Sequence, residues 1–146
     1  MSGYGSTGVD SSNDPKNPGT FRAGTNIVDQ MFSFDSGAQD AALITDFDAP
    51  PGFDPNGTLN TLGTAEPTSL EYHLAGGDSG GGAFVFENGQ WYVAGINSGV
   101  ASQFDFLESG SKQLFGYGAV SVMTRVSSFQ ISLLAFPESP NRGVWH

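Results

Sequence analysis

The Gly76–Gly82 run, GGDSGGG, constrains the fold of this chain more than any other stretch. It places one carboxylate and one hydroxyl among residues without bulk, so another polypeptide can approach its backbone closely. Glycine takes positive φ at little steric cost, and we expect Gly80 and Gly81 to form a tight turn after Ser79. An apolar, aromatic segment over residues 83–86 follows at once, which indicates a strand rather than a helix after the turn.

The composition favours one all-β domain with many turns. The 146 residues suffice for a single domain with a real core and are too few for two ordinary ones. The chain has 21 glycines and an apolar set dominated by strand formers, which is typical of β-structure. The formal net charge of −10 argues against nucleic-acid binding, which needs a basic surface, and no apolar run is long enough to span a membrane.

Apolar and aromatic segments separated by glycine- and proline-rich stretches predict about six strands. Five of these strands can be placed, at residues 21–34 with a bulge at Gly24, 41–47, 83–86, 91–98 and 115–126. The Asn88-Gly89 pair between two of them is typical of a type I′ hairpin turn, because both central residues need positive φ. Ser127 or Ser128 is expected to cap a short helix over residues 129–134.

Acidic residues gather near a long irregular stretch over residues 50–67. The oxygen-bearing side chains there are those of Asp46, Asp48, Asp54 and Asn56. Their spacing does not match the calcium-binding EF-hand loop, because no ordered run of ligands ends in a bidentate glutamate. We therefore predict no metal and no other cofactor, and we expect solvated loop carboxylates.

The Gly77–Gly81 segment, GDSGG, resembles the nucleophile segment of the trypsin-like (chymotrypsin-fold) serine proteases. The next residue in that family is usually proline, whereas this chain has Gly82. The same segment also fits the G-x-S-x-G nucleophile elbow of the α/β-hydrolases. That elbow needs a helix after the serine, and the strand predicted over residues 83–86 argues against it.

The resemblance implies a fold and domain limits. The Gly3–Gly8 segment, with its Gly-aromatic-Gly start, is similar to the segment that opens the second barrel of the family. On that basis residues 1–136 form the C-terminal barrel of a trypsin-like peptidase domain. This is a six-stranded antiparallel Greek-key barrel with a short C-terminal helix. Residues 137–146 are expected to form a tail.

The resemblance also assigns chemical roles to the turn. Ser79 matches the nucleophile that attacks the peptide carbonyl, and the N–H groups of Gly77 and Ser79 match the oxyanion hole. Asp78 matches the carboxylate that pairs with the new N-terminal ammonium after zymogen cleavage. Alternatively, Asp78 bonds the N–H groups of its own turn. Gly80 and Gly81 support the turn.

A substrate pocket is implied by further positions. His73 matches the floor of the primary specificity pocket, where trypsin-type enzymes carry an aspartate. A histidine there argues against lysine or arginine substrates and favours an acidic or aromatic side chain; alternatively, His73 is a half-buried histidine with a backbone partner. The Ser98-Gly99-Val100 segment matches the edge that pairs with the substrate backbone. Ser121 stands where a glycine commonly lines the pocket wall, so its side chain is expected to narrow the entrance.

A catalytic base is not found among the residues that match the family. A serine hydroxyl is a poor nucleophile without a base, and the chain has two histidines, His73 and His146, neither at the family's catalytic position. Three hypotheses stay open. The chain is the serine-bearing half of a serine endopeptidase, an inactive protease-like peptide-binding module, or a truncated product with an exposed apolar face. A retained Ser79 favours the first and third, because a binding module has no chemical need for it.

The first hypothesis implies partners and a location. The partners are a polypeptide substrate and an N-terminal barrel, bearing histidine and aspartate, that lies upstream or in a separate chain. We expect no nucleic acid and no membrane. The family implies an extracellular or periplasmic location, although the first five residues, MSGYG, lack the basic region and apolar core of a signal peptide. Their glycine-rich start suggests a chain cut from a longer one.

Overall fold

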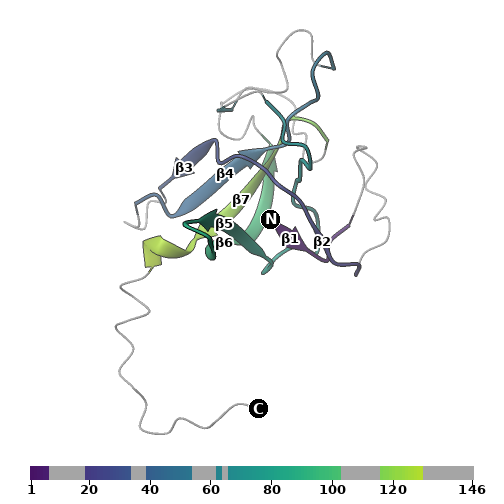
Figure 1. Cartoon of the computed structure of the whole chain (residues 1–146). Helices are drawn as coiled ribbons and strands as arrows, with labels where there is room; N and C mark the ends of the chain where they lie inside the picture. Colours follow the sequence, from purple (N-terminus) through teal and green to yellow (C-terminus); the bar gives the residue numbers. More distant parts are fainter. Residues whose placement is uncertain (7–18, 34–38, 54–61, 64–65, 103–115, 130–146) are drawn as a thin grey trace, which may run out of the picture.

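The described residues of the protein form strands in two antiparallel sheets. The computed structural model describes residues 1–6, 19–33, 39–53, 62–63, 66–102 and 116–129. The larger sheet has the strand order β3-β4-β7-β6-β5, and the smaller one pairs β1 with β2 (Figure 1). The strands are β1 (Ser2–Gly3), β2 (Arg22–Ala23), β3 (Gln30–Phe32), β4 (Ala42–Asp46), β5 (Gly82–Glu87), β6 (Gln90–Ser102) and β7 (Ala119–Arg125). Among the described residues the all-β class is confirmed, with seven strands where about six were expected. They form two open sheets, which do not show the closure of the expected Greek-key barrel.

The β5–β6 hairpin forms as the sequence predicts. Asn88 and Gly89 have φ values of 50° and 79°, which are the positive angles that a type I′ turn requires. The strands pair in register from Glu87↔Gln90 to Gly82↔Ile96, with an irregularity between Ala83 and Phe84. The hairpin therefore begins directly at the end of the glycine run.

The core lies on both faces of β4 and β7. All five residues of β4 are buried, because β3 and β7 flank the strand and side chains cover both of its faces. One buried cluster contains Ala42, Ile44, Leu62 and Val120, and the other contains Leu43, Leu74, Ala83 and Met123. Neighbouring residues of a strand point to opposite faces, which is why adjacent β4 residues fall into different clusters.

The single strand predicted over residues 21–34 is wrong, because the chain changes sheets within it. β2 ends at Ala23, and β3 begins at Gln30 in the other sheet. Gly24 is not a bulge. Its N–H donates to the Met1 carbonyl at 3.0 Å, and a Cβ added to it would lie 2.6 Å from the Leu70 carbonyl oxygen. This close backbone approach turns the chain out of β2.

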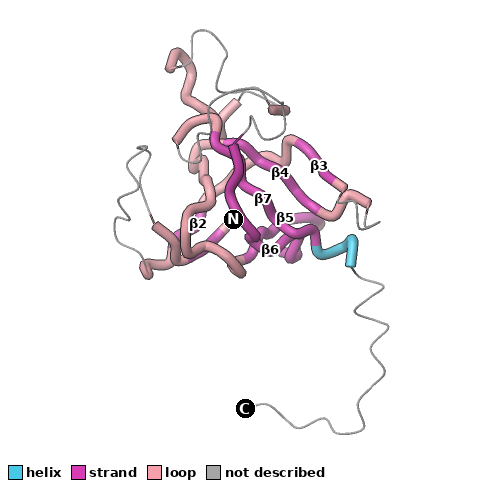
Figure 2. Tube along the Cα trace, turned by 180° about the vertical axis from the view of Figure 1, so that it is seen from behind, coloured by secondary structure: helices cyan, strands magenta, loops and turns pink. Residues whose placement is uncertain are grey.

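The C-terminal part of the described chain departs from the prediction in three ways. β6 continues to Ser102, four residues beyond its predicted end. β7 begins only at Ala119, because Gly116 and Gly118 adopt positive φ in a turn before it. Figure 2 shows a short helical turn after β7, a 3₁₀ turn over Val126–Phe129. Ser127 and Ser128 lie within this turn rather than at the start of a helix. Apart from Phe129, the helix predicted over residues 129–134 lies outside the described residues, as does the tail at 137–146.

Within the described ranges, no helix has both the length and the apolar character needed to cross a membrane.

Candidate functional site

Ser79 lies on a tight turn that leads into β5. The turn is closed by a hydrogen bond from the Asp78 N–H to the Ala75 carbonyl and by one from the Gly81 N–H to the Asp78 carbonyl, each 3.0 Å long. Gly77 and Gly80 adopt φ values of 99° and 83°. The expectation of positive φ is thus confirmed for Gly80 and wrong for Gly81, with Gly77 taking that role before the serine. The Ser79 side chain is exposed.

Two backbone N–H groups of this turn are not used inside the described structure. Asp78 and Gly81 donate within the turn, and Gly80 donates to the Asn97 carbonyl of β6 at 2.9 Å. Among the residues that the structure describes, the N–H groups of Gly77 and Ser79 donate to no partner. These are the two donors that the sequence assigns to an oxyanion hole.

Asp78 anchors the turn from beneath. Its side chain is buried, with 2% of its surface exposed. One carboxylate oxygen accepts a hydrogen bond from the Gly5 N–H at 2.7 Å, and the other accepts from the Ala75 N–H at 2.9 Å and from the Tyr72 hydroxyl at 3.2 Å. The carboxylate therefore bonds its own turn, as one of the two interpretations has it. The Met1 ammonium donates instead to the Gly24 carbonyl at 2.9 Å.

Tyr72 and Asn97 also support the turn. Burial, followed by the charge of Asp78, raises the pKa of Tyr72 to about 12, so its hydroxyl stays protonated and donates. The buried Asn97 amide donates to the Ser2 carbonyl at 2.8 Å and to the Asp78 carbonyl at 3.2 Å. Neither residue belongs to a motif, so only tertiary contacts identify them.

Gly81 is required by close packing. A Cβ added there would press directly on the Ser2 carbonyl oxygen and would lie 2.8 Å from the Asn97 amide nitrogen. A Cβ added to Gly76 would meet nothing within 4 Å.

We therefore expect Gly81→Ala to lower the free energy of unfolding by about 2–4 kcal/mol, because the backbone of β1 must move. The matched control, Gly76→Ala, should stay within about 0.5 kcal/mol of the parent protein. Urea denaturation curves of the two variants measure the difference. An equal loss in both variants would contradict the packing argument.

His73 is largely buried beside Phe47, with a centroid distance of 5.9 Å between the two rings. Its Nε2 atom is buried and has no hydrogen-bond partner among the described residues, so His73 does not serve Ser79 as a base. Burial lowers the pKa of His73 to about 4, although the Asp78 charge acts in the opposite direction. His73 is therefore neutral at physiological pH.

We expect the His73 ring to titrate near pH 4 in an NMR pH titration. Its folded pKa lies below the ordinary value of 6.5, so the stability that it contributes is present above pH 6.5. That stability is lost as the pH falls from 6.5 to about 4, by at most ~1.4 kcal/mol per pH unit. His73→Gln identifies the resonance. A midpoint near 6.5 would show that the ring is not buried as described.

The predicted edge segment lies next to the turn. β6 pairs with β7 as far as Ser102, but its pairing with β5 ends at Ile96. Beyond Ile96, Asn97 is the only residue of this segment that makes backbone hydrogen bonds on that side within the described residues, and its partners are Gly80 and Gly81. From Ser98 through Gly99 and Val100, the edge of β6 beside the turn faces no strand of the described residues. The Ser98 side chain is exposed and bonds the Thr124 hydroxyl at 2.7 Å.

Ser121 reaches the segment that carries His73, but it does not line an entrance. It is fully buried and pairs with Val100 across β6 and β7. Its hydroxyl oxygen accepts a hydrogen bond from the Leu74 N–H at 3.0 Å. The structure thus brings Ser121, Val100 and the His73-Leu74 backbone together. The hydroxyl fixes that backbone, so the expected narrowing of a pocket entrance by Ser121 is not seen.

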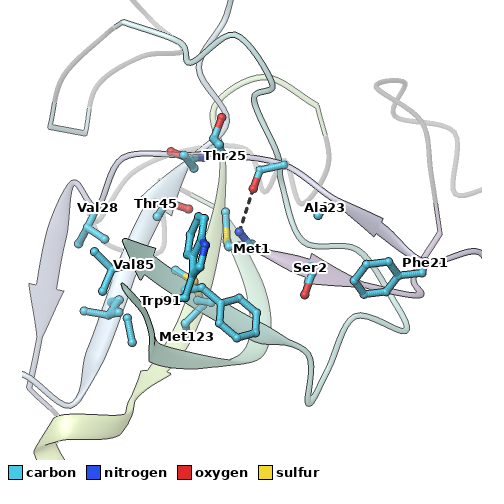
Figure 3. A pocket seen from close by; sticks show the side chains of 16 residues that line it. Met1, Ser2, Phe21, Ala23, Thr25, Val28, Thr45, Val85, Trp91 and Met123 are labelled. Atoms are coloured by element: carbon cyan, nitrogen blue, oxygen red, sulfur yellow. Dashed lines mark hydrogen bonds between the residues drawn. The ribbon is translucent and has the colours of Figure 1, made fainter. Parts of the chain in front are cut away.

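A separate apolar cavity of about 690 Å³ is lined by residues of the small sheet and by residues of β4, β5, β6 and β7 of the large one (Figure 3). Its lining includes Met1, Phe21, Val28, Val85, Trp91 and Met123. None of the residues assigned to catalysis or to the substrate pocket lines it.

No family model, no curated protein and no solved structure matches the chain.

Proposed function

We propose that this chain is the serine-bearing half of a trypsin-like serine endopeptidase, with Ser79 as the nucleophile. The observation that carries the proposal is the geometry of the turn. Its serine is exposed between two glycines of positive φ, and two backbone N–H groups beside it remain unused among the described residues. A buried carboxylate immediately before the serine holds the turn in place.

The proposed reaction is hydrolysis of a peptide bond through an acyl-enzyme. The Ser79 oxygen attacks the carbonyl carbon, and its proton passes to a base and then to the leaving amine. The N–H groups of Gly77 and Ser79 stabilise the oxyanion, and losing one such donor typically costs ~2.7–4 kcal/mol in the barrier. Water then hydrolyses the ester on Ser79.

The substrate backbone is proposed to bind along β6. The edge over Ser98, Gly99 and Val100 faces no described strand and begins one residue after Asn97, which bonds the turn. An extended peptide can add to such an edge through main-chain hydrogen bonds. His73, held near this edge through Leu74 and Ser121, stays the proposed floor of the specificity pocket, and a neutral imidazole there does not favour basic side chains.

The base is proposed to come from another segment or another chain that carries the histidine and aspartate of the triad. The buried Nε2 atom of His73 has no hydrogen-bond partner among the described residues, so His73 does not complete the triad. The β5–β6 hairpin leaves large aromatic side chains in solvent, with Trp91 exposed by 70% and Phe86 by 56%. Exposed apolar side chains of this size are consistent with a surface that meets another protein segment.

The test begins with the reading frame upstream of Met1 in the source DNA. The protein encoded by the full frame should be labelled at Ser79 by a fluorophosphonate and should cleave peptides, while the isolated 146-residue chain should show little or no turnover. Failure of the full-frame protein to be labelled would overturn the proposal. Turnover by the isolated chain that disappears in Ser79→Ala would overturn the need for a second segment.

A peptide-binding module without activity is the second candidate, favoured by the open edge of β6. Peptide affinity that is unchanged in Ser79→Ala, together with an absence of labelling, would support it over the enzyme. Extracellular or periplasmic action belongs to the proposal of protease function and is tested with it.

A further inference from the structure

Three carboxylates outside the Ser79 turn have buried oxygen atoms without partners. Both oxygens of Asp46, one oxygen of Asp48 and one oxygen of Glu71 are buried and accept no hydrogen bond from the described residues. Asp46 is fully buried, and Asp48 is only 2% exposed. The expectation that Asp46 and Asp48 are solvated loop carboxylates is therefore wrong.

Hydrogen bonds bring Asp46 and the segment of Glu71 into one region, and Asp48 follows Asp46 by two residues. The Asn26 amide donates to the Asp46 carbonyl at 2.6 Å and to the Tyr72 carbonyl at 3.1 Å, which places Glu71 beside the end of β4. One carboxylate oxygen of Glu71 accepts from the N–H and the hydroxyl of Thr68, both at 2.6 Å, and the other oxygen is left without a partner. The backbone of Asp46 is in turn held by the Asp29 carboxylate at 3.0 Å.

The cluster is electrostatically unfavourable without a positive charge. Burial, followed by the neighbouring charges of Asp48 and Asp29, raises the pKa of Asp46 to about 8. Burial, followed by the charges of Glu71, Asp29 and Glu66, raises the pKa of Asp48 to about 7. No basic side chain of the described residues acts on either pKa. Buried carboxylates are stable only when they are protonated, paired or bound to a metal.

We propose that Asp46, Asp48 and Glu71 bind a divalent cation, and that calcium fits them best. The donors are all oxygens, which calcium and magnesium prefer over nitrogen or sulfur ligands. Calcium accepts irregular geometry and completes its shell with backbone carbonyls and water, whereas magnesium demands a near-ideal octahedron. The proposal is independent of the function proposed for Ser79.

Calcium binding would need these side chains to move closer together. Among the described residues, no three acidic or histidine side chains already stand at metal-coordination spacing. Mutual repulsion keeps ionised carboxylates apart, and a cation at their centre replaces that repulsion with attraction. Since Asp46 and Asp48 flank Phe47, which contacts the His73 ring, the bound ion would also stiffen the support of His73.

The test measures thermal unfolding and terbium luminescence at pH 8. After treatment with EDTA, CaCl₂ should raise the melting temperature in a saturable manner, by roughly 5–10 °C at one hundred times the dissociation constant. Terbium should bind and be displaced by calcium. The Asp46→Asn and Glu71→Gln variants should lose both responses. Asp40→Asn, a change at an exposed turn residue, should keep both.

Glu71→Gln decides the result if Asp46→Asn does not fold, because glutamine can still accept the hydrogen bonds from Thr68. An absence of any saturable response to CaCl₂ or MgCl₂ up to 10 mM (roughly the weakest range for calcium sites) would overturn the proposal. A stability that rises as the pH falls from 8 to 6.5, without any added effect of calcium at either pH, would also overturn it. That result would show that the carboxyl groups are simply protonated in the folded protein. A carboxyl whose pKa is higher in the folded state than in the unfolded state makes the protein more stable as the pH falls through the folded pKa.

Discussion

Ser79→Ala is expected to abolish peptide hydrolysis and fluorophosphonate labelling in the protein encoded by the full reading frame. The turnover number should fall by roughly 10⁴–10⁶, the scale on which serine hydrolases lose activity when the nucleophile is removed. The physical reason is that alanine has no oxygen to form the acyl-enzyme, while the oxyanion donors remain. Initial rates on a fluorogenic peptide, together with active-site labelling, measure the effect.

The same substitution should leave the fold unchanged. Ser79 is exposed, and no hydrogen bond joins its side chain to another described residue, so the free energy of unfolding should change by less than about 0.5 kcal/mol. Ser127→Ala, at another exposed serine, is the control for activity. Full activity in Ser79→Ala would rule out Ser79 as the nucleophile and would leave the peptide-binding hypothesis in its place.

Asp78→Ala is expected to produce the largest loss of stability of any substitution in the turn, about 3–5 kcal/mol. The change leaves the N–H groups of Gly5 and Ala75 and the hydroxyl of Tyr72 without their acceptor in a buried place. Each unsatisfied buried donor typically costs ~1–3 kcal/mol, and the three costs are not additive because water can enter the space. Since domains have free energies of unfolding of only about 5–15 kcal/mol, we expect this variant to retain little stability.

Asp78→Asn separates hydrogen bonding from volume. An asparagine keeps the shape and one acceptor oxygen, but its NH₂ group must then face a donor, so we expect an intermediate loss. Guanidinium denaturation of Asp78→Ala, Asp78→Asn and Ser79→Ala gives the order of their free energies of unfolding. If Asp78→Ala proved as stable as Ser79→Ala, the buried carboxylate would not anchor the turn.

Local chemistry was enough to predict the hairpin and the central strand. Asn88 and Gly89 carry their own preference for positive φ, so the turn forms whatever surrounds it. β4 follows from a short apolar run, and its predicted limits of 41–47 differ from Ala42–Asp46 by one residue at each end. The glycine run likewise predicts a turn at Ser79, although it does not reveal which glycines take positive φ.

Tertiary contacts decided the path of the chain between β2 and β3. The apolar pattern over residues 21–34 is that of one strand, yet Gly24 must leave β2 because the backbones of Met1 and Leu70 lie against it. Asn26 then ties the connecting segment to β4 and to Tyr72. No periodicity in the sequence carries this information, because the contacting residues are 20 or more positions apart.

Local residue preferences are sufficient to predict the all-β class, the hairpin, and a small-residue turn that presents one serine and one carboxylate. These follow from the conformational preferences of glycine, asparagine and the strand-forming residues, which act over a few positions. By contrast, the contacts of Asp78 with Gly5 and Tyr72, the lowered pKa of His73 and the burial of Asp46 arise from tertiary packing. Burial and charge interactions depend on distance in space rather than along the chain, so they emerge only when the strands have assembled.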